Sequence, residues 1–255
     1  MSAVAAVRTP VSIRPAVILN LGCGSRTSPW CVNIDWSPYL RLKRSRVGSM
    51  VAPVLLRGER RERFAALAGN VVVHDLRRPI PVDDGSVDAV YHSHVLEHID
   101  RDLVAGFLAE VRRTLRPGGV HRIVVPDLEA ATRRYLAHLD ACASDPAAAV
   151  EHDGYVGAVI EQMVRRESTG AAGQPRLHRA VENVLFGDAR RRGETHQWMW
   201  DRMNLAVALA DAGFRDARVL DHRTSAIPGW DSIRLDELED GRAYKPESLY
   251  VEAVR

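Results

Sequence analysis

The segment AVILNLGCGSRTSPWCVNIDW, residues 16–36, decides the fold. Its mainly apolar start, residues 17–21, is typical of a buried parallel strand and stops at Gly22-Cys23-Gly24. A second short strand, residues 31–34, ends on Asp35. Glycine lets the backbone approach a ligand closely, and a carboxylate at the tip of the neighbouring strand can accept both hydroxyls of a ribose. The segment therefore predicts a nucleoside-binding site.

Cofactors with a pyrophosphate fit this segment poorly. A dinucleotide-binding loop needs a third glycine and an acid about 20 residues further on. Here SRTSPW follows Gly24, and Asp35 comes only 11 residues later, which is too few for a full crossover helix. A Gly-Lys-Ser/Thr phosphate loop is absent as well. A nucleoside ligand without phosphates is favoured.

The composition of the 255 residues is that of a globular α/β protein with a net charge of +2, so no global field indicates nucleic acid or an anionic membrane as partner. The three cysteines are odd in number and lack disulfide or metal spacing, which favours a reducing cytoplasm. No apolar run approaches membrane-spanning length. Residues 1–15 are predicted to be a flexible N-terminal arm, and the oligomeric state stays open.

Further strands are predicted at residues 71–73, 87–91, 123–125, 217–220 and 249–253. Helices are predicted at 102–115, from Asp127 onward, and at 202–212. Strand and helix alternate, which indicates a doubly wound, Rossmann-like, mostly parallel sheet of about seven strands. The helix that Asp127 caps is expected to bury Leu128, Tyr135, Leu136 and Leu139. Residues 140–195 break the alternation and are predicted to be a helical insertion or lid within a single domain, residues 16–255.

This order of elements resembles the class I S-adenosylmethionine-dependent methyltransferases. The resemblance is carried by the glycine loop, by the acids that end strands two and three, and by LRPGGV, residues 115–120. IPVDDGSVDAVYHSHVLEHI, residues 80–99, resembles the strand-four block of the type 11 subgroup. Asn20, which stands where many members have Asp, and the short segment after the glycine loop depart from the pattern.

The resemblance implies S-adenosylmethionine as the cofactor. Leu21, Gly22, Cys23 and Gly24 would lie under its methionine part, Asp35 would hold the ribose, and Asp75 with Leu76 would lie by the adenine. Ligands of such sheets lie beyond the carboxyl ends of the strands, so His92 and Ser93 are placed at the mouth of the cofactor site.

Residues 186–214, which include Thr195-His196-Gln197-Trp198, resemble methyltransferases associated with polysaccharide or cell-surface glycan synthesis. This resemblance implies O-methylation of a sugar, a glycan precursor or a glycosylated small molecule. N- or C-methylation of a natural product is the alternative enzyme. A partner subunit that binds the cofactor without turnover is the non-enzyme alternative.

Methyl transfer to a hydroxyl or amine needs alignment, exclusion of water and a group that takes the proton, a role that suits histidine. His94, after strand four, is the first candidate base, and the alternative is that it lines the pocket or caps the next helix. His196 is the second candidate. Trp198, Trp200 and Trp230 are candidates to stack on the acceptor, against the alternative that they pack in the fold.

A metal-binding interpretation is the alternative for His94-x-x-Glu97-His98, because this segment matches an inverted zinc-peptidase motif. A peptidase would need a long helix and a further ligand, and some methyltransferases bind magnesium at a related Glu-x-x-Glu-His. Hydrogen bonding of Glu97 and His98 within the fold is the preferred interpretation, so no metal is predicted. The alternative is that His94, Glu97 and His98 bind a metal, for which this nitrogen-rich set suits zinc or manganese better than magnesium. The remaining histidines form no recognisable constellation; they are His74, His121, His138, His152, His178 and His222.

Overall fold

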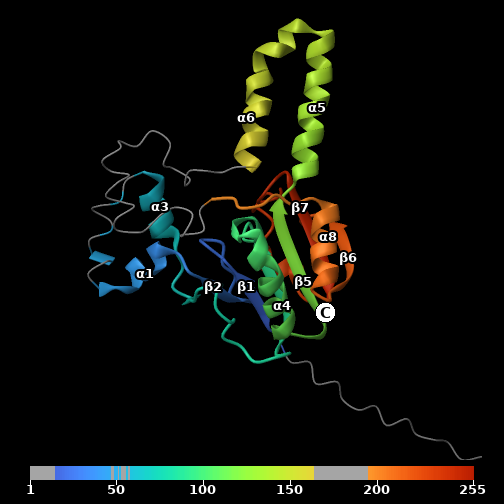
Figure 1. The fold of residues 1–255 in the computed structure, drawn as a ribbon. Coiled ribbons are helices and arrows are strands. Elements are labelled where there is room, and N and C mark those ends of the chain that lie inside the picture. The colour runs from blue at the N-terminus through green and yellow to red at the C-terminus, as the bar shows by residue number, and fades with distance from the viewer. Residues whose placement is uncertain (1–14, 47–48, 51, 53–55, 57, 164–194) are drawn as a thin grey trace, which may run out of the picture.

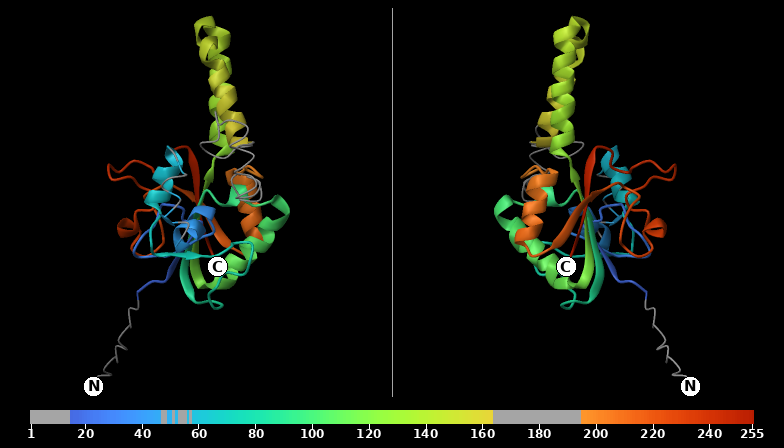
Figure 2. Two further views of the ribbon diagram at one scale, coloured as in Figure 1. Left: turned by 90° about the vertical axis from the view of Figure 1, so that its left-hand side faces the viewer. Right: turned by 90° about the vertical axis from the view of Figure 1, so that its right-hand side faces the viewer.

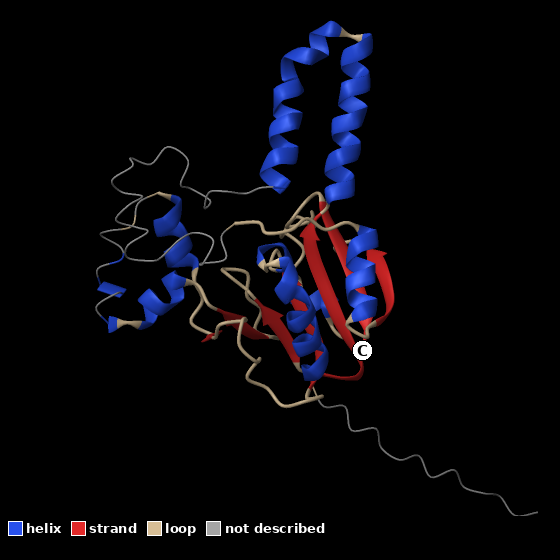
Figure 3. Cartoon of the chain, viewed as in Figure 1, coloured by secondary structure: helices blue, strands red, loops and turns tan. Residues whose placement is uncertain are grey.

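The computed structural model describes residues 15–46, 49–50, 52, 56, 58–163 and 195–255. These residues form a seven-stranded sheet flanked by helices (Figures 1 and 3). In chain order its strands are β1 (Ile18–Leu21), β2 (Val32–Asp35), β3 (Val71–Val73), β4 (Val87–Ser93), β5 (Leu115–Pro126), β6 (Arg215–Leu220) and β7 (Ser248–Val254). They lie side by side in the order β3-β2-β1-β4-β5-β7-β6. The first five are parallel and β7 is antiparallel to both neighbours, so the predicted fold class is confirmed.

The helices lie mainly between strands. They are α1 (Pro38–Arg44), α3 (Glu59–Ala66), α4 (Val104–Thr114), α5 (Leu128–Ser144), α6 (His152–Met163), α8 (Arg202–Asp211) and α9 (Trp230–Ile233), with 3-10 turns η1 (Leu96–His98), η2 (Arg101–Leu103) and η3 (Pro146–Glu151). Within the described ranges, no helix is both long and apolar enough to cross a bilayer.

Alternation along the strands separates the two faces of the sheet. Leu19, Leu21 and Val90 pack with the apolar sides of α4 and α8, whereas Ile18 and Tyr91 pack with Trp230 of α9. Figure 2 shows α4 and α8 together on one side of the sheet. The strands that end beside the glycine loop are thus fixed by a core on each face.

The Pro-Gly-Gly segment, residues 117–119, lies inside β5, which begins at Leu115 directly after α4 and not at residue 123 as predicted. The register with β4 shifts between the pairs Val87–Leu115 and Ala89–Val120. A Cβ on Gly119 would lie 2.9 Å from the carbonyl oxygen of Arg116, so this irregular stretch requires glycine there. The segment is a break in register rather than a loop before the strand.

Helix α5 begins as predicted, because Asp127 Oδ1 accepts hydrogen bonds from the amides of Glu129 and Ala130 at 2.9 and 3.2 Å. The expected burial of Leu136 and Leu139 is wrong, since they are 50% and 42% exposed. The reason is visible in Figures 1 and 2: α5 extends beyond the sheet and pairs with α6.

Two predictions concern residues that the structure does not describe. The N-terminal arm, residues 1–15, lies almost wholly outside the described residues, and so do residues 164–194 of the expected insertion. The insertion and the domain limits remain predictions.

Arg122 is the centre of a buried ionic cluster on β5. Its side chain is fully buried, and its guanidinium donates to Asp236 Oδ2 at 2.8 Å and to Glu252 Oε1 at 2.9 Å. The Tyr91 hydroxyl donates to the other oxygen of Asp236 at 2.6 Å, and the guanidinium lies 4.6 Å from the ring centroid of Trp230. Burial raises the pKa of the Asp236 carboxyl and the charge of Arg122 opposes that rise. The buried carboxylates of Asp236 and Glu252 therefore depend on the positive charge of Arg122.

His92 and His121 form a buried pair between β4 and β5. Both side chains are fully buried, their Nε2 atoms are 3.0 Å apart, and the His92 ring meets Phe107 edge to face. In such a contact one nitrogen donates and the other accepts, which requires the accepting ring to be neutral. Burial lowers the pKa of His92 to about 4 and that of His121 well below its usual value.

Arg122→Met keeps apolar volume but leaves two buried carboxylates without a cation. We expect the free energy of unfolding to fall by about 3–5 kcal/mol in urea denaturation. Arg242→Ala, at an exposed pair with Asp240, is the control and should leave the unfolding midpoint unchanged. Equal stability of Arg122→Met and the native chain would contradict the assigned role.

The buried histidine pair predicts a loss of stability in acid. The unfolded chain protonates histidine near pH 6.5, whereas folded His92 resists protonation until about pH 4, so the unfolded state binds more protons between these values. We expect His92 to contribute roughly 3 kcal/mol above pH 6.5 and to lose that contribution as the pH falls to 4. Urea denaturation as a function of pH measures it. His92→Leu should flatten the slope in this window, and an unchanged slope would refute the assignment.

Candidate functional site

The glycine loop is fixed by backbone contacts. The amides of Gly22 and Cys23 donate to the carbonyl oxygen of Ile34 at 2.8 and 3.2 Å, which ties the loop to β2. Gly22 has a φ of +64°, and a Cβ on it would lie 2.4 Å from Val95 Cγ2, so only glycine fits. At Gly24, by contrast, no atom of the described residues lies within 4 Å of such a Cβ. The loop thus packs on one side and leaves its backbone open on the other.

Asp35 lies beside this open backbone. The Gly24 amide donates to Asp35 Oδ2 at 2.5 Å and the Ser37 amide donates to Oδ1 at 2.7 Å. Burial raises the pKa of Asp35, and these backbone hydrogen bonds oppose the rise. A carboxylate has about four acceptor positions, so both oxygens can also accept ribose hydroxyls. An open glycine loop beside a half-buried carboxylate fits a nucleoside-bearing cofactor.

Asn20, where related sequences have Asp, has a structural role. Its side-chain amide donates to the Asn33 side chain and to the carbonyl oxygen of Arg26, both at 2.9 Å. Asn33 in turn donates to the carbonyl oxygen of Ser28 at 2.9 Å. This buried network holds the short segment between β1 and β2, so that no helix is needed to bring Asp35 to the loop.

Asp75 and Leu76 follow β3 at the same edge of the sheet. The amide of His74 donates to the carbonyl oxygen of Asp35 at 3.0 Å, which joins the ends of β2 and β3. Arg77 donates to both oxygens of Asp75 at 2.9 and 2.7 Å and lowers its pKa. Leu76 packs against the main core. Their predicted place by the adenine remains a prediction.

His94 stands in an unusual backbone conformation, with a φ of +54° in a residue that is not glycine. Its amide donates to the Val124 carbonyl oxygen at 2.8 Å, its Nδ1 lies 3.2 Å from Glu97 Oε1, and its Nε2 lies 3.0 Å from Ser248 Oγ. Left-handed backbone costs a non-glycine residue about 1–2 kcal/mol and is found at functional sites. The conformation places an imidazole between a carboxylate and a hydroxyl.

Glu97, His94 and Ser248 form a row of three neighbouring side chains, and Glu97 supplies its carboxylate. It is fully buried, neither of its oxygens has a hydrogen-bond partner among the described residues, and although burial raises its pKa, the nearby imidazoles of His94 and His98 bring the pKa to about 2. An ionised Glu97 favours a proton on Nδ1 of His94, which leaves Nε2 as the basic nitrogen. The arrangement can take a proton from a hydroxyl at the position of Ser248 Oγ.

His98 and His196 meet on the other side of Glu97. Their ring centroids are 4.9 Å apart, and His98 Nδ1 lies 3.1 Å from the Thr195 carbonyl oxygen. Burial lowers the pKa of His98, and Glu97 opposes that shift. The amides of Gln197 and Trp198 donate to the Glu97 carbonyl oxygen at 2.6 and 3.3 Å. The structure therefore brings both predicted histidine positions, far apart in sequence, to one place.

The competing metal motif is not on a long helix. Residues 96–98 form a single 3-10 turn, so His94 and His98 do not share the face of an α-helix and the peptidase reading fails. Ligand atoms of Glu97, His98 and His196 do lie within 4.8 Å of one another.

Two of the three predicted acceptor-binding tryptophans are corrected. Trp200 is fully buried in the main core, and Trp230 is 5% exposed and packs on Tyr91 on the opposite face of the sheet. Both are packing residues. Trp198 is 42% exposed and lies beside Arg101 and the turn at Glu97, so it remains a candidate acceptor-binding residue.

The predicted cofactor-site residues at the end of β4 and in the glycine loop differ in where their side chains lie. His92 was expected at the mouth, but its side chain lies in the core pair described above, which is a second correction. Ser93 ends β4 and is half-buried. Cys23 is buried, and burial raises the pKa of its thiol to about 12, so it acts as a small packing residue in the loop.

Two residues near the site were not predicted from the sequence. Ser248 contacts His94 from β7, and no local motif marks a serine so far along the chain. Trp36 directly follows Asp35 and is 37% exposed. Its position directly after Asp35 was a usable signal, because aromatic rings stack on nucleobases; in the structure the guanidinium of Arg41 lies over this ring at 4.9 Å.

Part of the chain is similar to known proteins. Residues 19–123 match a family model described as a methyltransferase domain. An uncharacterised 37.1 kDa transposon protein of Streptomyces fradiae is 32% identical over 117 residues, which are 46% of this chain and 32% of that protein. The matched segment thus spans about a third of the curated relative's length.

Solved structures of S-adenosylmethionine-dependent methyltransferases show a weaker likeness. One from Archaeoglobus fulgidus is 13% identical, covers 94% of this chain and 86% of its own, and gives a TM-score of 0.41. One from Methanosarcina mazei is 15% identical, covers 95% of this chain and 92% of its own, and gives a TM-score of 0.44. One from Mesorhizobium loti is 17% identical, covers 94% and 90%, and gives 0.42. Because these scores are low, the fold assignment rests on the strand order of this chain. The family match, which contains the glycine loop, Asp35 and the turn at Glu97, supports an S-adenosylmethionine-dependent methyltransferase and implies S-adenosylmethionine as its cofactor.

Proposed function

We propose that this protein transfers a methyl group from S-adenosylmethionine to a hydroxyl of a sugar, a glycan precursor or a glycosylated small molecule. The observation that carries the hydroxyl acceptor is the row Glu97–His94–Ser248. Ser248 Oγ lies 3.0 Å from Nε2 of His94, which supports a hydroxyl as the partner of this nitrogen, and an acceptor hydroxyl would replace it there. The exposed face of Trp198 supports a sugar ring as part of the acceptor.

When bound, S-adenosylmethionine supplies a methyl group on a sulfonium that is already an activated leaving group. Asp35 and the open backbone at Gly24 would hold the nucleoside part. His94 would take the proton of the acceptor hydroxyl at Nε2 while the methyl group passes from the sulfonium to the oxygen. Glu97 orients the imidazole and balances its charge. Because the donor needs no further activation, alignment and proton removal are the main tasks of the chain.

Binding of S-adenosylhomocysteine tests the cofactor site. We expect calorimetry to detect binding by the native chain and Asp35→Ala to weaken it by about 1–3 kcal/mol, because the ribose hydroxyls lose a charged acceptor. Asp83→Ala, an exposed aspartate before the start of β4, is the matched control and should bind like the native chain. Absence of native binding would refute the cofactor assignment.

The catalytic row is tested with isotope-labelled methyl donor and a panel of sugars and glycosides. We expect His94→Ala to lower the turnover of a labelled acceptor by about 10²–10⁴-fold, the usual contribution of a general base. Glu97→Gln should lower it by a smaller factor in the native background and have no further effect when His94 is already Ala, since both act through one imidazole. His222→Ala is the histidine control.

Independent, additive effects of the two substitutions would contradict the row. If the chain binds S-adenosylhomocysteine but labels none of the hydroxyl acceptors, while an amine or carbon acceptor is labelled, the O-methylation proposal is wrong. Binding with no labelling of any class would favour a cofactor-binding partner subunit.

A further inference from the structure

A second group of metal-ligating side chains lies in the α5–α6 hairpin, outside the candidate active site. His138 and Cys142 are four residues apart on α5, a spacing that places them on one face of the helix. His152 is the first residue of α6, and the turn η3 folds it back toward them. Three strong ligands from two helices thus converge, although the sequence showed no recognisable motif.

The distances match a tetrahedral site. Cys142 Sγ lies 3.7 Å from His138 Nε2 and 3.9 Å from His152 Nδ1, and the three ligand atoms lie within 4.8 Å of one another. A tetrahedral zinc ion with bonds of about 2.0–2.1 Å to nitrogen and 2.3 Å to sulfur separates those atoms by about 3.6 Å. Only small side-chain adjustments are therefore needed to bring the three atoms around one ion.

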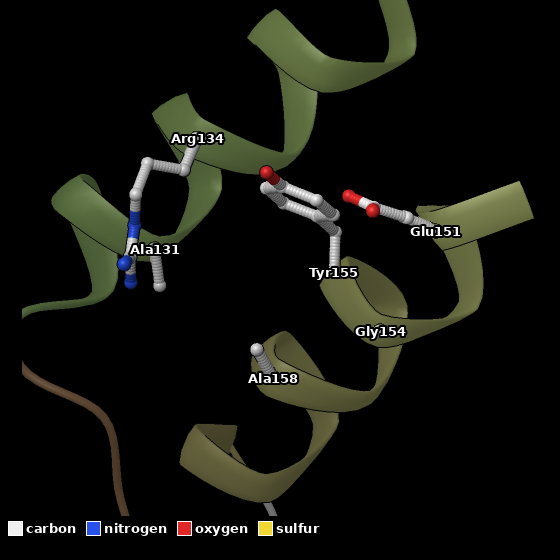
Figure 4. Close-up of a pocket in the computed structure, with 6 residues that line it drawn as sticks. All are labelled: Ala131, Arg134, Glu151, Gly154, Tyr155 and Ala158. Atoms are coloured by element: carbon white, nitrogen blue, oxygen red, sulfur yellow. The ribbon is translucent and has the colours of Figure 1, made fainter. Parts of the chain in front are cut away.

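Aromatic neighbours hold the two imidazoles in place. The His138 ring stacks on Tyr155 with centroids 3.8 Å apart and an angle of 16° between the rings, and the His152 ring lies 5.6 Å from that of Tyr135. Tyr155 also lines a hollow of about 420 Å³ between the two helices (Figure 4). In Figure 4 its ring projects from α6 toward α5, with Arg134 and Glu151 on either side. The ligands are thus supported by packing, and each is only half-buried, which leaves access for an ion.

We propose that His138, Cys142 and His152 bind a zinc-class divalent cation that ties the start of α6 to α5, with water in the fourth position. Two imidazole nitrogens and one thiolate suit zinc, whereas magnesium and calcium prefer oxygen ligands. Binding forms two metal–nitrogen bonds and one metal–sulfur bond, and the Cys142 thiol gives its proton to solvent. The site is independent of methyl transfer.

Cobalt(II) distinguishes this site from the group at Glu97, His98 and His196, which contains no sulfur. The probe is cobalt(II) added to the full, reduced, metal-free chain, and the signal is the thiolate-to-cobalt charge-transfer band. We expect about one equivalent of cobalt to produce the band and zinc to displace it. Zinc should also raise the midpoint of thermal unfolding.

Cys142→Ser should abolish the band and the thermal shift, and His152→Gln should weaken cobalt binding at least tenfold. Cys31→Ser, another half-buried cysteine, and His98→Ala should both keep the band. Circular dichroism of each variant checks that the helices are formed. A native chain that binds no cobalt or gives no thiolate band, or a Cys142→Ser variant that keeps the band, would overturn the proposal.

Discussion

The close contact between Gly22 and Val95 is the constraint on which the candidate site depends. It presses the turn after β1 against the turn after β4, and no larger residue than glycine fits between them. One side of this contact carries the open backbone of Gly24 and the carboxylate of Asp35, while the other carries His94 and Glu97. The contact therefore keeps the residues proposed to hold the cofactor next to those proposed to take the proton.

The sequence predicted this edge of the sheet because the signals are local and backbone-based. Apolar runs that stop at Gly22, at Asp35 and at His92-Ser93-His94 identify strand ends, and parallel strands bring their carboxyl ends to one edge. The cap at Asp127 is also a property of a few neighbouring residues. Such features can be recognised in a single sequence without any knowledge of the tertiary packing.

Burial was harder to predict, because it depends on contacts between distant segments. Trp198 and Trp200 are two residues apart and equally apolar, yet one is exposed beside the turn at Glu97 and the other is fully buried. Arg122 gives no sign in the sequence that it lies in the core, since its partners Asp236 and Glu252 are more than a hundred residues away. The expected burial of Leu136 failed for a related reason: α5 follows a helical period but extends away from the sheet that would have covered it.

Glu97 explains why the site needs the C-terminal third of the chain, although the family match ends at residue 123. Its side chain lies beside His94 and His98, while its carbonyl oxygen accepts the amides of Gln197 and Trp198. One residue thus holds the imidazoles of the strand-four block and docks the segment that carries His196. The residues proposed to meet the acceptor, Trp198 and the position of Ser248, therefore lie outside the segment that the family model covers.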